Sequence, residues 1–181
     1  MRSDTASGGT VTAVAPLDEA VDHVRGPAGA HVILEYGDYE CPYSRAAFRA
    51  IQRVERAMSG RVRFALRHFP LTEIHPHALA AAAAAEAAAL QGRFWEMSEA
   101  LFHRQNALAD RDLRRFAGEL GMDLARFDAD RTAGPVLARV RRDVESGLAS
   151  RQVRGTPTLF IDGRLHERRY DTATLLEELE T

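Results

Sequence analysis

Apolar residues recur along the chain with two different periods, and the order of these periods predicts an α/β protein. Residues 32–36 form a short apolar run closed by a glycine, which is typical of a buried strand. Apolar side chains at every third or fourth position from Phe48 to Met58 predict a helix, and alternation over residues 62–66 predicts a second strand. Because one helix joins the two strands, we expect a parallel pair with a right-handed crossover.

The pattern turns wholly helical after this unit and returns to strands only near the C-terminus. Consecutive helices are expected over residues 77–91, 93–105, 110–120, 123–131 and 133–152. The side chains expected in the core of these helices are Phe94, Trp95 and Met97. Residues 156–169 predict a β-hairpin around the turn "DGR", and residues 171–180 predict a closing helix with Asp171 as its N-cap.

This order of elements predicts one α/β domain that carries an insertion. Residues 29–74 and 152–181 are expected to form the α/β domain, and residues 75–151 are expected to form an inserted all-helical subdomain. Residues 1–28 are small, polar and punctuated by glycine and proline, so a loosely ordered N-terminal segment is expected there.

Composition limits the kinds of partner that we expect the protein to bind and the compartment in which we expect it. The chain has 181 residues and a formal net charge of −2, so no nucleic-acid partner is expected. No stretch approaches the roughly 18 apolar residues of a membrane span, and the N-terminus lacks the apolar core of a secretory signal. We therefore expect no membrane span and a cytoplasmic location. The single cysteine excludes an internal disulfide.

That cysteine stands in the stretch "YECPYS", directly after the first predicted strand. Backbone N–H groups at a helix N-terminus stabilise a negative charge, so a partly exposed and reactive thiolate is expected at Cys41. Pro42 suits the first helical position, and Tyr43 can shape the surface beside the sulfur. Ser44 can offer a hydroxyl to the thiolate but cannot form a disulfide. The alternative is an inert, buried cysteine that packs as a small apolar residue.

A second element, "RGTPTLF", precedes the C-terminal hairpin. The bond between Thr156 and Pro157 is a candidate cis peptide, and in such a turn the Thr156 backbone can pair with an extended substrate beside Cys41. The alternative is a trans proline that only opens a strand.

Other polar residues near the cysteine are weaker candidates. His75 and His77 flank a proline without a third ligand nearby, so they are interpreted as residues at the start of a helix, and no metal site is predicted. Asp38 and Glu40 either oppose a negative charge on Cys41 or are solvated.

The three blocks together resemble a known family. "YGDYECPYS" after a strand, the helical block and "GTPTLFIDGR" before the last helix resemble the DsbA-like branch of the thioredoxin superfamily, over residues 22–180. They are similar to bacterial DsbA-like domains, some of which are fused to sodium/proton antiporters. The resemblance implies a thioredoxin fold, a central mixed sheet flanked by helices with a helical insertion. It also implies a nucleophilic Cys41, a cis Pro157 facing it, and Glu35 as a buried acid that takes up protons.

The departure from this family is Ser44, which stands where a C-x-x-C site has its second cysteine. The resemblance then implies a monothiol thiol–disulfide oxidoreductase, because a single thiolate at Cys41 still forms mixed disulfides. Its partners would be protein or peptide thiols and disulfides, contacted by Pro42, Tyr43, Thr156 and Pro157. Release would need glutathione or another low-molecular-weight thiol as co-substrate, with no bound cofactor.

Three alternatives remain open at this point. One is that the serine at position 44 was substituted for cysteine to trap substrates. The chain could be an enzyme similar to kappa-class glutathione transferases, which use a serine near the start of the first helix. It could also be a thioredoxin-like module that binds peptides along the Thr156 backbone without catalysis.

Overall fold

A five-stranded mixed sheet forms the centre of the computed structural model, which describes residues 14–181. The strands are β1 (His23–Arg25), β2 (His31–Gly37), β3 (Val62–His68), β4 (Thr158–Ile161) and β5 (Arg164–Leu165). Their order across the sheet is β1-β3-β2-β4-β5. β2 and β3 are parallel, as predicted, and the other neighbouring pairs are antiparallel.

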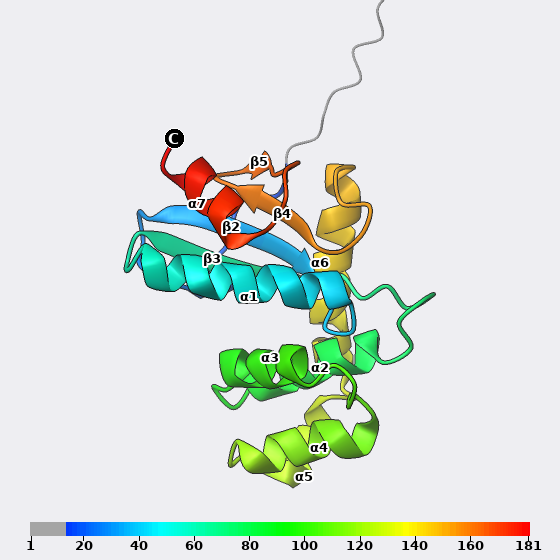
Figure 1. Cartoon of the computed structure of the whole chain (residues 1–181). Coiled ribbons are helices and arrows are strands. Elements are labelled where there is room, and N and C mark those ends of the chain that lie inside the picture. The colour runs from blue at the N-terminus through cyan, green and yellow to red at the C-terminus, as the bar shows by residue number, and fades with distance from the viewer. Residues whose placement is uncertain (1–13) are drawn as a thin grey trace, which may run out of the picture.

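Helices cover the sheet and extend beyond it. They are α1 (Pro42–Ala57), α2 (Ala78–Ala89), α3 (Phe94–His103), α4 (Asp110–Glu119), α5 (Leu124–Asp130), α6 (Gly134–Ser150) and α7 (Thr172–Leu179). Figure 1 shows α2 to α5 gathered beyond α1, with the long α6 leading from them back to the sheet. The predicted α/β architecture with a helical insertion is therefore confirmed, as are the C-terminal hairpin and the Asp171 cap of α7.

Side chains along the strands point alternately to the two faces of the sheet, and this divides the core into two clusters on opposite faces. Ile33 and Phe64 belong to the large cluster that includes α1, α3 and α7, whereas Leu34 and Tyr36 belong to a smaller one beside α6. Since successive strand residues point to opposite faces, Glu35 faces the same side as Ile33. This places the Glu35 carboxyl group on the face covered by α1.

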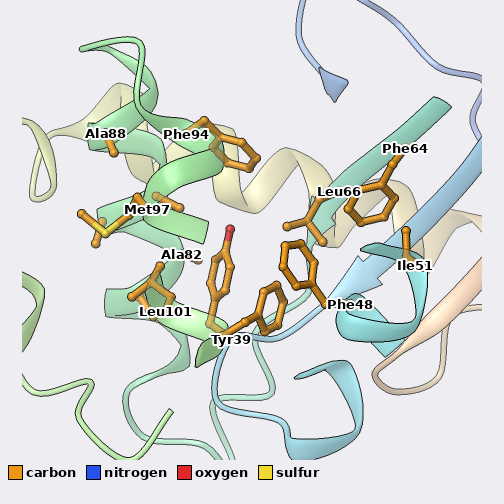
Figure 2. Packing of buried hydrophobic residues seen from close by; sticks show 14 of the residues in the cluster. Tyr39, Phe48, Ile51, Phe64, Leu66, Ala82, Ala88, Phe94, Met97 and Leu101 are labelled. Carbon is orange, nitrogen blue, oxygen red and sulfur yellow. The ribbon is translucent and has the colours of Figure 1, made fainter. Parts of the chain in front are cut away.

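Tyr39 joins the helical insertion to the rest of the core. Figure 2 shows its ring between Leu101 of α3, Phe48 of α1 and Leu66 of β3. Its hydroxyl group lies 2.7 Å from Ser98 Oγ in α3, so the one polar atom of this buried ring is satisfied. Phe94 and Met97 are buried as predicted, and Trp95 packs against the same cluster while Arg25 lies over its ring.

The expectation of a loosely ordered segment over residues 1–28 is wrong for its last part. Residues 1–13 lie outside the described residues, but β1 pairs with β3. The physical reason is the buried Arg67, which donates to both carboxylate oxygens of Asp22 at 3.0 and 2.7 Å. It also donates to the carbonyls of Ala15 and Pro16 at 2.9 and 2.8 Å. A buried guanidinium needs such partners, and these residues supply them.

Within residues 14–181, no helix is both long and apolar enough to cross a membrane.

We expect Asp22→Ala to lower the free energy of unfolding by roughly 3–5 kcal/mol, because it leaves the buried Arg67 charge without its carboxylate. Urea denaturation measures this change. Glu177→Ala is the matched control, since it removes an exposed ion pair with Arg168 and should change the free energy of unfolding by less than about 1 kcal/mol. Equal effects of the two substitutions would show that the buried pair does not hold the N-terminal segment.

Candidate active site

Cys41 is the N-cap of α1, and its sulfur points at the loop before β4. Pro42 occupies the first turn of the helix, as predicted. The Cys41 amide donates to the Asp38 carbonyl at 3.1 Å, which closes the turn between β2 and α1. Cys41 Sγ donates to the Thr156 carbonyl oxygen at 3.3 Å, across 115 residues of sequence. The sequence-predicted cysteine and the "GTP" segment are therefore in direct contact.

The expected partial exposure of Cys41 is not observed, since only 3% of the residue is exposed. The Thr156 carbonyl lies against the sulfur, and Tyr170 lies close enough for their charges to interact. The pKa of Tyr170 is raised by its partial burial and then by the charges of Cys41 and Tyr43. By contrast Tyr43 is 64% exposed.

Thr156 and Pro157 form the second wall of the site. Their peptide bond is cis. Thr156 Oγ1 is buried, and among residues 14–181 it has no hydrogen-bond partner. Thr156 therefore presents a polar atom next to Cys41 that the rest of the described chain does not satisfy.

Ser44 lies one turn along α1 and is fully buried. Its hydroxyl oxygen accepts the Asp38 amide at 3.2 Å. The hydrogen bond of this hydroxyl is therefore to the turn before α1 and not to the sulfur. It helps to hold Cys41 at the helix start.

Asp38 is buried, so of the two alternatives for this carboxylate the solvated one is wrong. Its Oδ1 accepts the Glu40 amide at 2.8 Å, and its Oδ2 accepts the Leu71 amide and faces His75 Nδ1, each at 2.8 Å. Glu40 similarly meets the amide and Nδ1 of His77, at 2.7 and 3.0 Å. Both histidines therefore bind the turn that carries Cys41, a role that the sequence did not indicate.

Gln105 is a residue that the sequence analysis missed. It follows α3, and its side-chain amide donates to the carbonyls of Tyr39 and Cys41, at 2.7 and 2.8 Å. A glutamine at the end of an amphipathic helix gives no sequence signal for this contact, because its partners lie 66 and 64 residues away. The helical insertion thus holds the active-site turn through one side chain.

Glu35 is completely buried on β2, and burial raises its pKa to about 8. Within the described residues neither carboxylate oxygen has a hydrogen-bond partner. A Cβ atom at Gly37 would lie 3.0 Å from Glu35 Oε1, so the glycine leaves room for this carboxyl group. A buried carboxyl group with a pKa near neutrality can hold or release a proton without a large change of pH.

The geometry agrees with comparisons to known proteins. A family model described as thioredoxin matches residues 18–181. The chain belongs to this thioredoxin family. It is 43% identical over 168 residues to the Na(+)/H(+) antiporter NhaA 1 of Mycolicibacterium gilvum, covering 91% of this chain and 27% of that protein. It is 44% identical over 174 residues to NhaA 3 of Salinispora tropica, covering 94% and 26%. The chain thus spans about a quarter of the length of these curated relatives.

Solved structures of the thioredoxin type share its fold. A thioredoxin-like oxidoreductase from Silicibacter pomeroyi has a TM-score of 0.77 at 27% identity, covering 88% of this chain and 90% of that one. BdbD from Bacillus subtilis has a TM-score of 0.78 at 18% identity, covering 93% and 96%. A thioredoxin fold with a helical insertion is therefore shown for this chain.

We expect Gln105→Glu to weaken the turn that carries Cys41, because a carboxylate cannot donate to the two carbonyls. The free energy of unfolding should fall by roughly 1–3 kcal/mol, and the rate at which Cys41 reacts with a disulfide probe should fall several-fold. Gln52→Glu is the control, since Gln52 donates to Glu99 away from the turn. If the Gln105→Glu variant reacts at the parent's rate, Gln105 does not position Cys41.

We expect Glu35 to make the protein less stable as pH rises from about 4.5 to about 8. Its pKa is raised in the folded state, so in this window the unfolded chain loses the Glu35 proton while the folded chain keeps it. Glu35→Gln should remove this dependence and should be the more stable protein at pH 8 by several kcal/mol. Urea denaturation from pH 5 to 8.5 tests this, and identical pH slopes for both proteins would contradict it.

Proposed function

We propose that the chain is a monothiol thiol–disulfide oxidoreductase that acts through Cys41. The observation that carries this proposal is the contact between Cys41 Sγ and the Thr156 carbonyl at the start of α1. The thioredoxin family match and the fold of its structural neighbours support redox chemistry at this position. The single cysteine of the sequence restricts that chemistry to mixed disulfides.

The proposed reaction has two exchange steps. The Cys41 thiolate attacks the small-thiol sulfur of a mixed disulfide between a protein and a low-molecular-weight thiol, and the protein leaves as a thiolate that takes a proton. A second molecule of the small thiol, as its thiolate, then attacks the sulfur bound to Cys41. This step releases the small disulfide and restores Cys41, so the protein sulfur is reduced while one molecule of the free small thiol is oxidised.

Loss of the Cys41 proton also prepares the site for a peptide. The thiol is the donor to the Thr156 carbonyl, and a thiolate cannot donate. The carbonyl then needs another donor, which the backbone N–H of an extended peptide can supply. Thr156 Oγ1 offers a second polar contact, and Pro42, Tyr43 and Pro157 complete the surface that we assign to the substrate.

Glu35 is proposed to hold and return the proton of this exchange. It lies on the sheet face covered by α1, and at its pKa of about 8 the carboxyl group is mostly protonated at neutral pH. The charge of Glu35 also contributes to the raised pKa of Tyr39, after burial and Glu86, which places Glu35 close to the turn that carries Cys41.

The external thiol is proposed to be anionic, such as glutathione. A groove of about 620 Å³ beside Tyr170 is lined by three arginines, two acidic residues and the small Ala46 and Ala50. The arginines are Arg53, Arg168 and Arg169, and the acids are Glu167 and Asp171, of which Asp171 pairs with Arg169. Guanidinium groups bind carboxylates well. A reducing compartment such as the cytoplasm would supply such a thiol.

We expect the protein to reduce a glutathionylated peptide repeatedly only when free glutathione is present, because Ser44 cannot resolve the mixed disulfide. Cys41→Ala should abolish turnover. Ser44→Cys should form an internal disulfide on oxidation, because two cysteines in a C-x-x-C pair at a helix start lie close enough to bond. The measurement is peptide release over time for the three proteins, with and without glutathione.

Two outcomes would redirect the proposal. Full activity of Cys41→Ala would place the chemistry elsewhere. A Cys41 that never forms a mixed disulfide, in a protein that still binds extended peptides, would favour the binding module, for which the unsatisfied Thr156 Oγ1 is the supporting observation.

A further inference from the structure

A cluster of two histidines and one glutamate lies inside the molecule and uses none of the residues assigned to the cysteine chemistry. His23 comes from β1, His68 from the end of β3 and Glu86 from α2. The Nε2 atoms of the two rings lie 2.8 and 2.7 Å from the same oxygen, Glu86 Oε1. The ligand atoms of all three residues lie within 4.8 Å of one another. Three separate elements therefore direct two nitrogens and one carboxylate at one point.

Neighbouring rings fix the orientation of both imidazoles. His23 stacks on Phe94 with ring centroids 3.5 Å apart and an angle of 14° between the planes. His68 meets the same Phe94 ring edge-on at 6.0 Å and packs against Tyr39 at 5.8 Å. The side chains of His68 and Glu86 are only 1% and 6% exposed, whereas that of His23 is 19% exposed. The cluster is therefore buried on its inner side and partly exposed on the His23 side.

One oxygen of the Glu86 carboxylate faces both rings, at 2.8 Å from His23 Nε2 and 2.7 Å from His68 Nε2. Since an ionised carboxylate only accepts hydrogen bonds, both rings donate from Nε2 in this state. A cation could replace these two hydrogens at the point where the three side chains meet.

We propose that His23, His68 and Glu86 bind one divalent transition-metal ion, of which Zn²⁺ fits best. Two imidazoles and one carboxylate are ligands that Zn²⁺ accepts at about 2.0–2.2 Å, whereas Ca²⁺ and Mg²⁺ prefer oxygen atoms. Tetrahedral ligands at that distance lie roughly 3.3 Å apart, so each Nε2 must move from Oε1 by about half an ångström. The ion takes the place of the Nε2 hydrogens, and a neutral ring that binds the ion through Nε2 carries its one proton on Nδ1. A water on the exposed His23 side would complete the four ligands.

This inference does not depend on the proposed reaction at Cys41. No local motif indicates such a site, because Glu86 lies 63 residues from His23 and 18 residues from His68. The histidines that stood out in the sequence, His75 and His77, bind carboxylates of the active-site turn instead.

The test is a titration of the metal-free, tag-free chain with Co²⁺, followed by visible absorption, and then by displacement with Zn²⁺. The expected result is one Co²⁺ per chain with the absorption of a tetrahedral site, lost when Zn²⁺ is added. Glu86→Gln keeps the size of the side chain and should weaken binding by roughly a hundredfold or more, because even the loss of groups that only orient ligands weakens metal sites 10- to 100-fold.

Further variants separate a metal site from incidental binding. His23→Gln replaces the most exposed ligand, which lies on a short edge strand, and it should also abolish the absorption. This variant keeps the proposal testable if Glu86→Gln fails to fold. The control variants His103→Ala, an exposed histidine on α3, and Cys41→Ser should bind Co²⁺ like the parent. The proposal is overturned if the parent chain lacks the tetrahedral absorption, or if the absorption survives His23→Gln. The three side chains would then form a hydrogen-bonded cluster without a metal.

Discussion

The rest of the site depends on how the turn between β2 and α1, which carries Cys41, is held in place. Contacts from distant parts of the chain hold this turn at the start of α1. Asp38 binds the loop before α2, and Gln105 from the end of α3 binds the carbonyls of Tyr39 and Cys41. The sulfur itself contacts Thr156 before β4. Because each contact comes from a distant segment, the helical insertion and the sheet must both be folded before the thiol is in place.

This arrangement is compatible with the proposed exchange at a buried sulfur. The thiol donates to the Thr156 carbonyl, and in the proposed reaction deprotonation frees that carbonyl for a peptide N–H. Glu35 is buried without a partner among the described residues, and its pKa of about 8 suits the proton transfer proposed for it. Ser44 keeps the geometry of the turn through the Asp38 amide but adds no second redox group. The proposed chemistry is thereby limited to mixed disulfides.

Much of the fold could be predicted from the sequence because it follows from local periodicity. The strands around Ile33 and Phe64, the helices of the insertion and the final hairpin all carry strong patterns of apolar residues. β1 was missed because its pairing depends on Arg67 binding Asp22, a contact across 45 residues.

The site was predictable where residues are close in sequence and not where they are distant. Cys41, Pro42 and Ser44 form one motif, whereas the role of Gln105 depends on packing that no local pattern records. The burial of Cys41 was also hidden, since it results from the contact with Thr156.

The most direct test of the account is the intact mass of the chain after a short exposure to a glutathionylated peptide without free glutathione. The account predicts that one glutathione moves from the peptide to Cys41 and that one peptide thiol appears for each modified chain. A chain that keeps its original mass while the peptide stays modified would contradict the claim that Cys41 is the reacting thiol.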